Sequence, residues 1–180
     1  MPKQQSDNGD NSRLSRFAPE EIRRHTFQRA LKLLAAKPYS IAELRDRLLR
    51  GRTTNKAAVE AAISRLREYG YLDDERFAFG YASLKVQQRP VGRRRLKQDL
   101  ALKKVDPALA EGVLDLVFAE VSEETLIDRA VEKRIRLRGR PRNRAEAKSL
   151  FDHLLRQGFP LETVAEKVRS VSRIDLDEIN

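Results

Sequence analysis

Three consecutive carboxylates, Asp73, Asp74 and Glu75, are of a type that could support acid–base chemistry or bind a metal ion. They follow Gly70 at the junction of two helical patterns, where an aspartate can accept hydrogen bonds from the free amides of a helix start. A glutamate in the first helical turn also suits the positive end of the helix dipole. Because capping accounts for all three acids, we interpret them as structural residues.

The remaining chemistry-bearing residue types do not assemble a site either. The two histidines, His25 and His153, lie far apart and have no metal-ligand spacing. Cysteine is absent, which excludes disulfides, thiolate metal sites and cysteine nucleophiles. The chain also has no Walker-type phosphate loop and no glycine-rich dinucleotide fingerprint. We therefore expect no catalytic residue, no metal site, no cofactor and no enzymatic activity.

Positive charge is concentrated in two stretches of the chain. Residues 89–104 hold seven basic residues and one acidic residue, a net charge of +6, and residues 133–144 hold seven basic residues and no acid, a net charge of +7. The whole chain carries +10, so the rest is slightly acidic. Two patches of this kind predict a polyanion or an acidic protein surface as partner; the alternative is a pair of solvated helix faces.

Composition favours a helical protein with modest cores, because 40% of the 180 residues are hydrophobic and 36% are charged. No apolar run approaches the roughly 20 residues of a membrane span. Residues 1–16 lack the apolar segment of a secretory signal. We expect a cytoplasmic protein with no membrane contact.

Apolar spacing predicts helices throughout the chain. Each expected second helix carries two leucines four positions apart, and these pairs recur after 52 and 54 residues: Leu44 and Leu48, Leu96 and Leu100, Leu150 and Leu154. A period near 50 residues indicates stacked helical units that each bury a small core. The predicted fold is all-α, with three tandem three-helix repeats in an elongated array that can curve.

The expected boundaries follow the turn signals. They comprise a disordered tail over residues 1–16, a first repeat over 17–72, a second over 73–120, a third over 121–172 and an acidic tail over 173–180. We expect the first helix to begin at His25 and to bury Phe27, Ala30, Leu31 and Leu34, and the helix from Asp74 to bury Phe77, Tyr81 and Leu84. Lys104 follows the second helix of its repeat, where Gly51 and Gly158 stand in the other repeats. A left-handed residue often ends a helix at such a place.

One segment has a competing interpretation. Residues 134–138 alternate charged and apolar side chains as a strand would, but the helical spacing from Leu126 to Ile135 favours the end of a helix.

A sequence-specific DNA-binding protein of the winged-helix type is the alternative class. Residues 40–72 are compatible with a helix-turn-helix whose recognition helix would be 56–68. That helix is nearly neutral, and a new helix starts after Leu72 where a wing hairpin should follow.

The segment GYLDDERFA, followed by the basic RPVGRRRLKQDL, resembles the RecX family of regulatory proteins, and the resemblance extends from about Thr26 to Val171. It implies a monomeric modulator that binds the RecA filament on DNA and inhibits its recombinase, ATPase and coprotease activities. Its processes would be DNA repair, recombination and the SOS response, with only weak, non-specific DNA binding of its own.

On this hypothesis the two basic stretches contact the RecA filament or DNA phosphate, and the motif residues fix the junction of repeats. The expected contact residues are Arg89, Arg93, Arg94, Arg95, Lys97, Lys103, Lys104, Arg134, Arg136, Arg138, Arg140, Arg142 and Arg144. The motif residues expected to be structural are Tyr71, Leu72, Asp73, Asp74 and Phe77.

Overall fold

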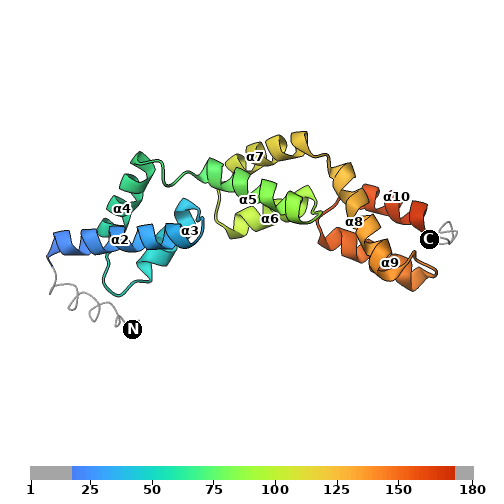
Figure 1. Ribbon diagram of the computed structural model, residues 1–180, viewed down its shortest axis with the longest axis horizontal. Helices are drawn as coiled ribbons and strands as arrows, with labels where there is room; N and C mark the ends of the chain where they lie inside the picture. The colour runs from blue at the N-terminus through green and yellow to red at the C-terminus, as the bar shows by residue number, and fades with distance from the viewer. Residues whose placement is uncertain (1–17, 173–180) are drawn as a thin grey trace, which may run out of the picture. The chain divides into compact units, whose positions relative to one another are not determined.

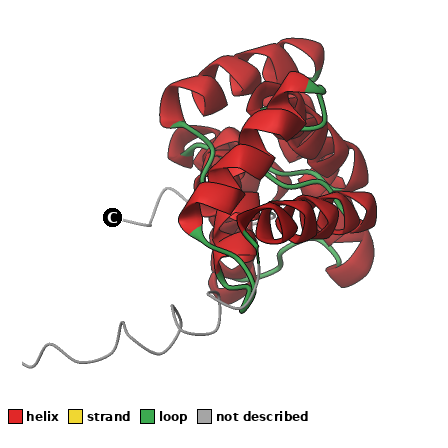
Figure 2. Ribbon diagram, turned by 90° about the vertical axis from the view of Figure 1, so that its left-hand side faces the viewer, coloured by secondary structure: helices red, strands yellow, loops and turns green. Residues whose placement is uncertain are grey.

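The computed structural model describes residues 18–172, which form helices joined by short turns and contain no strand (Figures 1 and 2). The three helices of the first repeat pack on one another, as do those of the third, and the second and third helices of the second repeat pack together. The all-α prediction of tandem three-helix repeats is confirmed. The expected tails, 1–16 and 173–180, lie outside the described residues.

The first repeat surrounds a core built by its second and third helices. Its leucine pair is completely buried, as is Val59, and Ile63 and Leu66 complete the same apolar face as the spacing predicts. Asn55 begins the third helix by accepting a hydrogen bond from the amide of Ala58 at 2.8 Å. The three helices are α2 (Pro19–Ala36), α3 (Ile41–Leu49) and α4 (Lys56–Glu68).

The first helix begins six residues earlier than predicted. Pro19 occupies its first position, where a missing amide costs nothing, and two glutamates follow it in the first turn. The buried face is therefore Ile22, Thr26 and Ala30, whereas Leu31 is 37% exposed. The prediction of a start at His25 was wrong because it gave no weight to the Pro-Glu-Glu start signal.

The second repeat contains α5 (Asp74–Gln88), α6 (Arg93–Leu102) and α7 (Pro107–Glu120). The apolar stripe of α7 is buried. The prediction that α5 buries Phe77, Tyr81 and Leu84 is wrong. Its small residues Ala78 and Ala82 and its Val86 point inward, whereas Leu84 is 53% exposed. Small side chains permit close packing of α5, which apolar size alone does not predict.

The third repeat contains α8 (Glu123–Arg138), α9 (Arg144–Arg156) and α10 (Leu161–Val171). The alternating segment 134–138 is the last turns of α8, so the helical interpretation is confirmed. The leucine pair of α9 is buried and packs with Val164 and Val168 of α10, while Leu161 is 60% exposed.

The described residues divide into two compact units. The first contains residues 18–77 with 103–105, and the second contains 78–102 with 106–172. No strand follows Leu72 in either unit, because α5 starts at Asp74. The described chain thus lacks the wing hairpin that the winged-helix alternative requires.

Two residues with a left-handed backbone follow the second helices of the second and third repeats, α6 and α9. Gly158 has a φ of +90°, and Lys104 is the one described non-glycine residue with a positive φ, +57°. The inferred equivalence holds for these two positions but not for Gly51, which has no positive φ.

Replacing Gly158 by alanine should destabilise the protein by about 2 to 5 kcal/mol. An added Cβ would overlap the backbone nitrogen of Arg95 and lie 2.6 Å from its Cβ. The left-handed backbone costs about 1 to 2 kcal/mol and the overpacking about 1 to 3 kcal/mol. Urea unfolding measures the loss. Gly112→Ala is the matched control, because its position is helical and open, and it should be stabilising by about 0.4 to 1 kcal/mol.

Lys104→Gly should change the free energy of unfolding by less than about 1 kcal/mol. It relieves left-handed strain of about 1 to 2 kcal/mol but adds unfolded-state entropy of about 0.4 to 1 kcal/mol. It also removes an exposed ion pair with Asp46, worth about 0 to 1 kcal/mol. Thermal unfolding beside Asp46→Asn, which removes the ion pair alone, separates these terms. A larger loss in Lys104→Gly would show that its left-handed backbone is not strained.

Candidate functional site

The motif residues lie where α5 begins. Asp73 caps α5, because its Oδ1 accepts hydrogen bonds from the amides of Glu75 and Arg76 at 2.9 and 3.0 Å. Asp74 accepts a hydrogen bond from the amide of Ile41 at 2.8 Å and so joins the starts of two helices. These carboxylates satisfy backbone donors, which leaves no acid–base pair in the motif.

The other motif residues differ in burial. Leu72 is buried with the core of the first repeat. Phe77 is half-buried, and Tyr71 is 63% exposed with its ring edge against Tyr69, at a centroid distance of 6.2 Å.

The basic stretch of the second repeat is largely neutralised by carboxylates of the protein, and three of its cations pair within the second repeat. Arg93 contacts Glu111 at 2.7 Å and Asp115 at 2.8 Å, both on α7, and Lys97 also pairs with Glu111. Hydrogen bonds from Lys97 and then Arg93 hold the pKa of Glu111 below its ordinary value. The side chain of Arg95 pairs with Asp99 at 3.1 Å.

The two lysines that end this stretch are also paired. Lys103 contacts Glu43 of α3 at 3.0 Å, and Lys104 pairs with Asp46. The hydrogen bond from Lys104 is the main reason that the pKa of Asp46 is lowered. Among the described residues, only Arg89 and Arg94 of the seven expected contacts in this stretch have no ion pair.

The glycine of the basic motif has a packing role that the sequence did not reveal. The amide of Gly92 donates to the carbonyl of Gln157 at 2.9 Å, and a Cβ on Gly92 would overlap the backbone of Gly158. Next to it, the amide of Arg93 donates to Glu123 at 2.7 Å. This part of the motif therefore joins the second and third repeats.

The third repeat presents the opposite electrostatic situation. Arg134 and Arg138 on α8 and Arg156 on α9 have no carboxylate within ion-pair distance among the described residues. Arg134 is half-buried, and its Nη2 donates to the neutral hydroxyl of Ser149 at 3.1 Å. Burial, and then repulsion from Arg138 and Arg156, lower the pKa of Arg134.

A histidine completes this group. His153 on α9 is half-buried, and its pKa is lowered by burial and then by repulsion from four nearby cations. Neither this histidine nor Arg156 was expected at the site, because the positions come together only when α9 packs on α8. We call this group the α8/α9 cluster; its members are Lys133, Arg134, Arg138, His153 and Arg156.

A cleft of about 240 Å³ lies beside the cluster. It is lined by Arg134, Ile135, Arg138, Gly139, Pro141, Glu146, Ser149 and Leu150. Glu146, the acid in this lining, is engaged with the helix start: it accepts a hydrogen bond from the amide of Arg142 at 2.8 Å and one from the Asn143 side chain at 3.2 Å.

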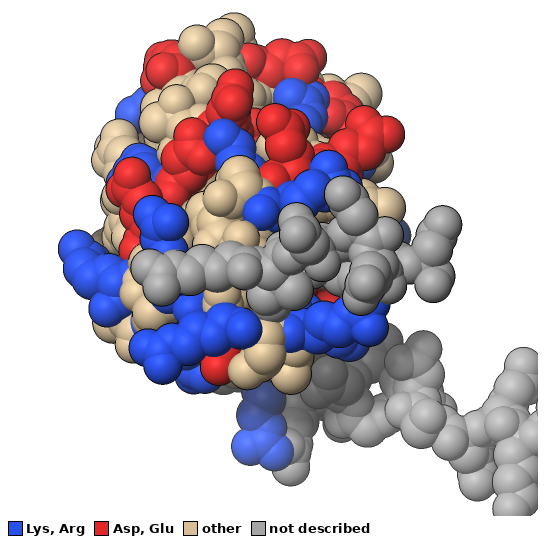
Figure 3. Space-filling model, turned by 90° about the vertical axis from the view of Figure 1, so that its right-hand side faces the viewer, with Lys and Arg blue, Asp and Glu red and all other residues tan. Residues whose placement is uncertain are grey.

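The face of the structure formed by the third repeat separates the two signs of charge. Figure 3 shows lysine and arginine side chains gathered over one part of this face and aspartate and glutamate over another. The turn between α8 and α9 carries further exposed cations of the basic stretch 133–144. The remaining predicted contacts there are Arg136, Arg140, Arg142 and Arg144, all exposed.

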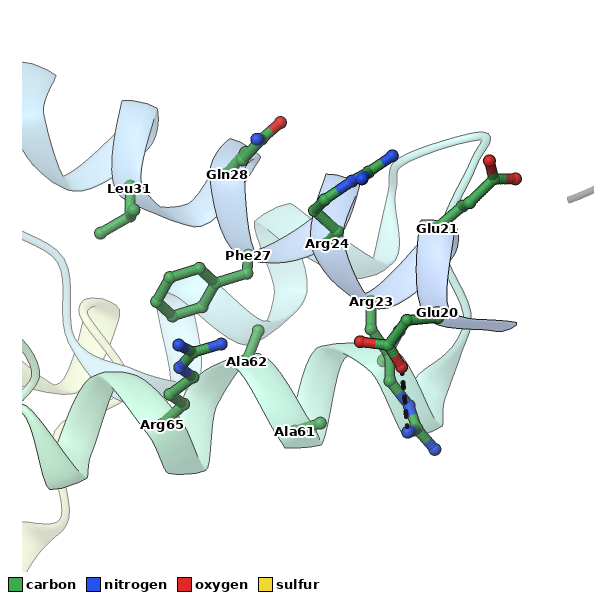
Figure 4. A pocket seen from close by; sticks show the side chains of 11 residues that line it. Glu20, Glu21, Arg23, Arg24, Phe27, Gln28, Leu31, Ala61, Ala62 and Arg65 are labelled. Atoms are coloured by element: carbon green, nitrogen blue, oxygen red, sulfur yellow. Dashed lines mark ion pairs between the residues drawn. The ribbon is translucent and has the colours of Figure 1, made fainter. Parts of the chain in front are cut away.

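A second surface feature lies in the first repeat, where α2 and α4 form a groove of about 630 Å³ (Figure 4). Phe27 and Leu31 form one wall, and alanines of α4 form the floor. The Arg65 guanidinium lies 4.7 Å from the centre of the Phe27 ring. The rim mixes both signs, with Glu20 and Arg23 paired at 3.6 Å, so it favours no single charge in a partner.

Residues 18–172 contain neither a cluster of metal-ligand side chains nor a helix suited to cross a membrane. No group of three or more histidine, cysteine, aspartate or glutamate side chains is arranged to hold a metal ion within residues 18–172. None of the helices described is both long enough and apolar enough to cross a bilayer.

The amino-acid sequence of this chain is similar to known proteins of one family. A family model described as the second three-helix domain of RecX matches residues 73–114. The regulatory protein RecX of Treponema pallidum is 42% identical over 110 residues, which cover 61% of this chain and 66% of the relative, slightly under two thirds of its length. RecX of Thermus thermophilus is 36% identical over 140 residues, which cover 78% of this chain and 87% of the relative.

The fold is also that of known RecX structures. The crystal structure of RecX from Lactobacillus salivarius has a TM-score of 0.71 at 18% identity and covers 84% of this chain and 97% of that one. The fold is thus that of a protein of tandem three-helix repeats. The similarity to the Thermus relative and to the family model shows that the chain belongs to the RecX family.

His153 should titrate below the ordinary histidine value of about 6.5. Because the native state disfavours its proton, stability should be complete above pH 6.5 and should fall as the pH drops from there through the folded pKa. Arg134→Gln should raise this pKa by removing one repelling charge. NMR titration checks both points; no rise in Arg134→Gln would contradict the proximity of Arg134 to His153.

Proposed function

We propose that this protein binds the RecA nucleoprotein filament and inhibits its recombinase, ATPase and coprotease activities, and so modulates DNA repair and recombination. Membership in the RecX family, whose matched relatives are named regulatory proteins, supports the regulatory role. The filament is the partner that the family resemblance implies. On this proposal the protein acts as a cytoplasmic monomer without a catalytic centre.

The observation that carries the choice of surface is the difference between the two basic stretches. Five of the seven cations in the basic stretch 89–104 already have carboxylate partners inside the protein. A partner would have to replace those ion pairs, and exchanging one pair for another yields little free energy. The third repeat holds cations without such partners, so a polyanionic filament gains the full attraction there.

The ion pairs of Arg93 make it a poor position for a mutational test, whereas exposed arginines of the third repeat are suitable. Arg93→Glu would place a carboxylate beside Glu111, Asp115 and Glu123, so loss of inhibition could reflect a damaged fold. Arg136 and Arg140 are exposed, and the described residues offer them no ion pair. Their reversal therefore removes surface charge at small structural cost.

Arg136→Glu with Arg140→Glu should weaken inhibition of the DNA-dependent ATPase of RecA by about tenfold or more, without changing the melting temperature by more than a few degrees. The double variant Arg52→Glu with Arg67→Glu is the matched control, because it makes the same change in net charge at exposed positions of the first repeat. It should inhibit as the unchanged protein does.

Co-sedimentation with RecA on single-stranded DNA should show the same order of binding. If the unchanged protein left filaments and their ATPase unaffected at stoichiometric amounts, the proposed function would be wrong. If both double variants lost inhibition equally, net charge and not the third repeat would be responsible. Footprinting on duplex DNA should reveal no single tight operator, whereas a winged-helix regulator would prefer one by about 10³-fold or more.

A further inference from the structure

The α8/α9 cluster brings four cations and a histidine together without using their charge in the fold. Carboxylates form ion pairs with Arg93 in the second repeat. Among the described residues, the half-buried Arg134 donates only to the hydroxyl of Ser149. Holding like charges together costs free energy unless an anion compensates them. The fold maintains this arrangement by packing α9 on α8, with Ala147, Leu150 and Leu154 buried in between.

We propose that the α8/α9 cluster is a binding site for a phosphate group of a nucleic-acid strand, and that His153 takes up a proton from solvent when the phosphate binds. This assignment rests on the proposed function only for its biological setting, since it concerns a contact that nucleic acid alone can make.

Two members of the cluster line the cleft, and a hydroxyl and a further arginine lie near them. Arg134 and Arg138 line the cleft from α8, and guanidinium groups match phosphate oxygens with paired donors. Ser149 supplies a neutral hydroxyl at the same cleft, within hydrogen-bond distance of Arg134. Arg156 adds charge from α9 near Arg134 and His153.

A strand of phosphates fits this surface better than an acidic protein does. A nucleic-acid strand presents one charge about every 3.4 Å, all of one sign. The cluster continues into Arg140 and Arg142 of the α8–α9 turn, which are exposed and have no ion pair among the described residues, so one strand could meet cations along this stretch. Folded protein surfaces intersperse both signs and would bring cations against these arginines.

His153 is the member whose charge can change near neutral pH. The groups that act on it are Lys133, Arg134 and Arg138 from α8 and Arg156 from α9. From α10, which also packs on α9, Lys167 is engaged with Asp128 at 2.6 Å and with Glu124. Asp128 lies about 15 Å along α8 from Arg138 and about 7.5 to 9 Å from Lys133 and Arg134, and its charge is already compensated by Lys167.

The proton uptake follows from charge balance. With the site empty, the surrounding cations disfavour the charged imidazolium. A bound phosphate cancels their repulsion and accepts a hydrogen bond from the ring, so the charged form becomes favoured. Binding should therefore weaken as pH rises, by at most tenfold per pH unit, because a single group titrates.

The test uses the full chain and a fluorescently labelled oligothymidylate of about 20 nucleotides, with anisotropy measured from pH 5.5 to 8 at constant ionic strength. The unchanged protein should lose affinity as pH rises. His153→Gln should flatten that dependence, and Arg134→Gln should weaken binding at every pH. Lys148→Gln is the matched control, because it removes a cation of α9 that pairs with Asp152 outside the cluster. It should keep the full pH dependence.

NMR titration of His153 separates the sources of phosphate. Inorganic phosphate, compared with chloride at equal ionic strength, and the oligonucleotide should each raise the pKa of His153. An effect of the oligonucleotide alone would still support the site and assign it to a strand. The proposal is overturned if the oligonucleotide binds while His153 does not respond, or if a polyglutamate peptide shifts His153 and the oligonucleotide does not.

These outcomes are independent of RecA. A protein that passes the oligonucleotide test but leaves RecA filaments untouched would retain the phosphate site and lose the proposed function. A protein that inhibits filaments through Arg136 and Arg140 but shows no response at His153 would do the reverse.

Discussion

Compensation of arginine charge decides which parts of this surface hold the fold together and which remain available. A half-buried guanidinium has lost part of its hydration and needs acceptors nearby. Arg93 obtains two carboxylates from α7 and one more at its backbone amide, and so ties α6 to its neighbours. Arg134 obtains a single hydroxyl from α9. Two basic stretches of equal appearance therefore differ in how their charge is compensated, because different helices pack against them.

The compensation of surface charge can differ between the repeats because their cores are small and built alike. Each contains a buried leucine pair on its second helix, and side-chain caps at Ser40, Asn55, Asp106, Ser122 and Asn143 satisfy the free amides of helix starts. Such caps are typically worth about 1 kcal/mol each, and short turns follow from them. Charged side chains are then left for the surface, where they can be paired or unpaired without changing the core.

The fold was largely predictable because its signals are local. Leucines four apart, caps and the glycine after α4, with a φ of +69°, specify helices and turns within a few residues. The errors concern information beyond one helix. The inward face of α5 is set by small alanines that permit close packing, and apolar size pointed instead to Phe77, Tyr81 and Leu84. Gly92 is required by the approach of Gly158, 66 positions away in the chain.

The candidate site was predictable in composition but not in arrangement. Counting charges located both basic stretches, yet Glu111, Asp115, Glu43 and Asp46 lie too far along the chain for a count to assign them as partners. The same distance concealed His153 and Arg156, which reach the cations of α8 only through the packing of α9. Charge density in a sequence therefore identifies where a polyanion could bind. Whether those charges are free to bind it depends on tertiary contacts, and here those contacts favour the third repeat.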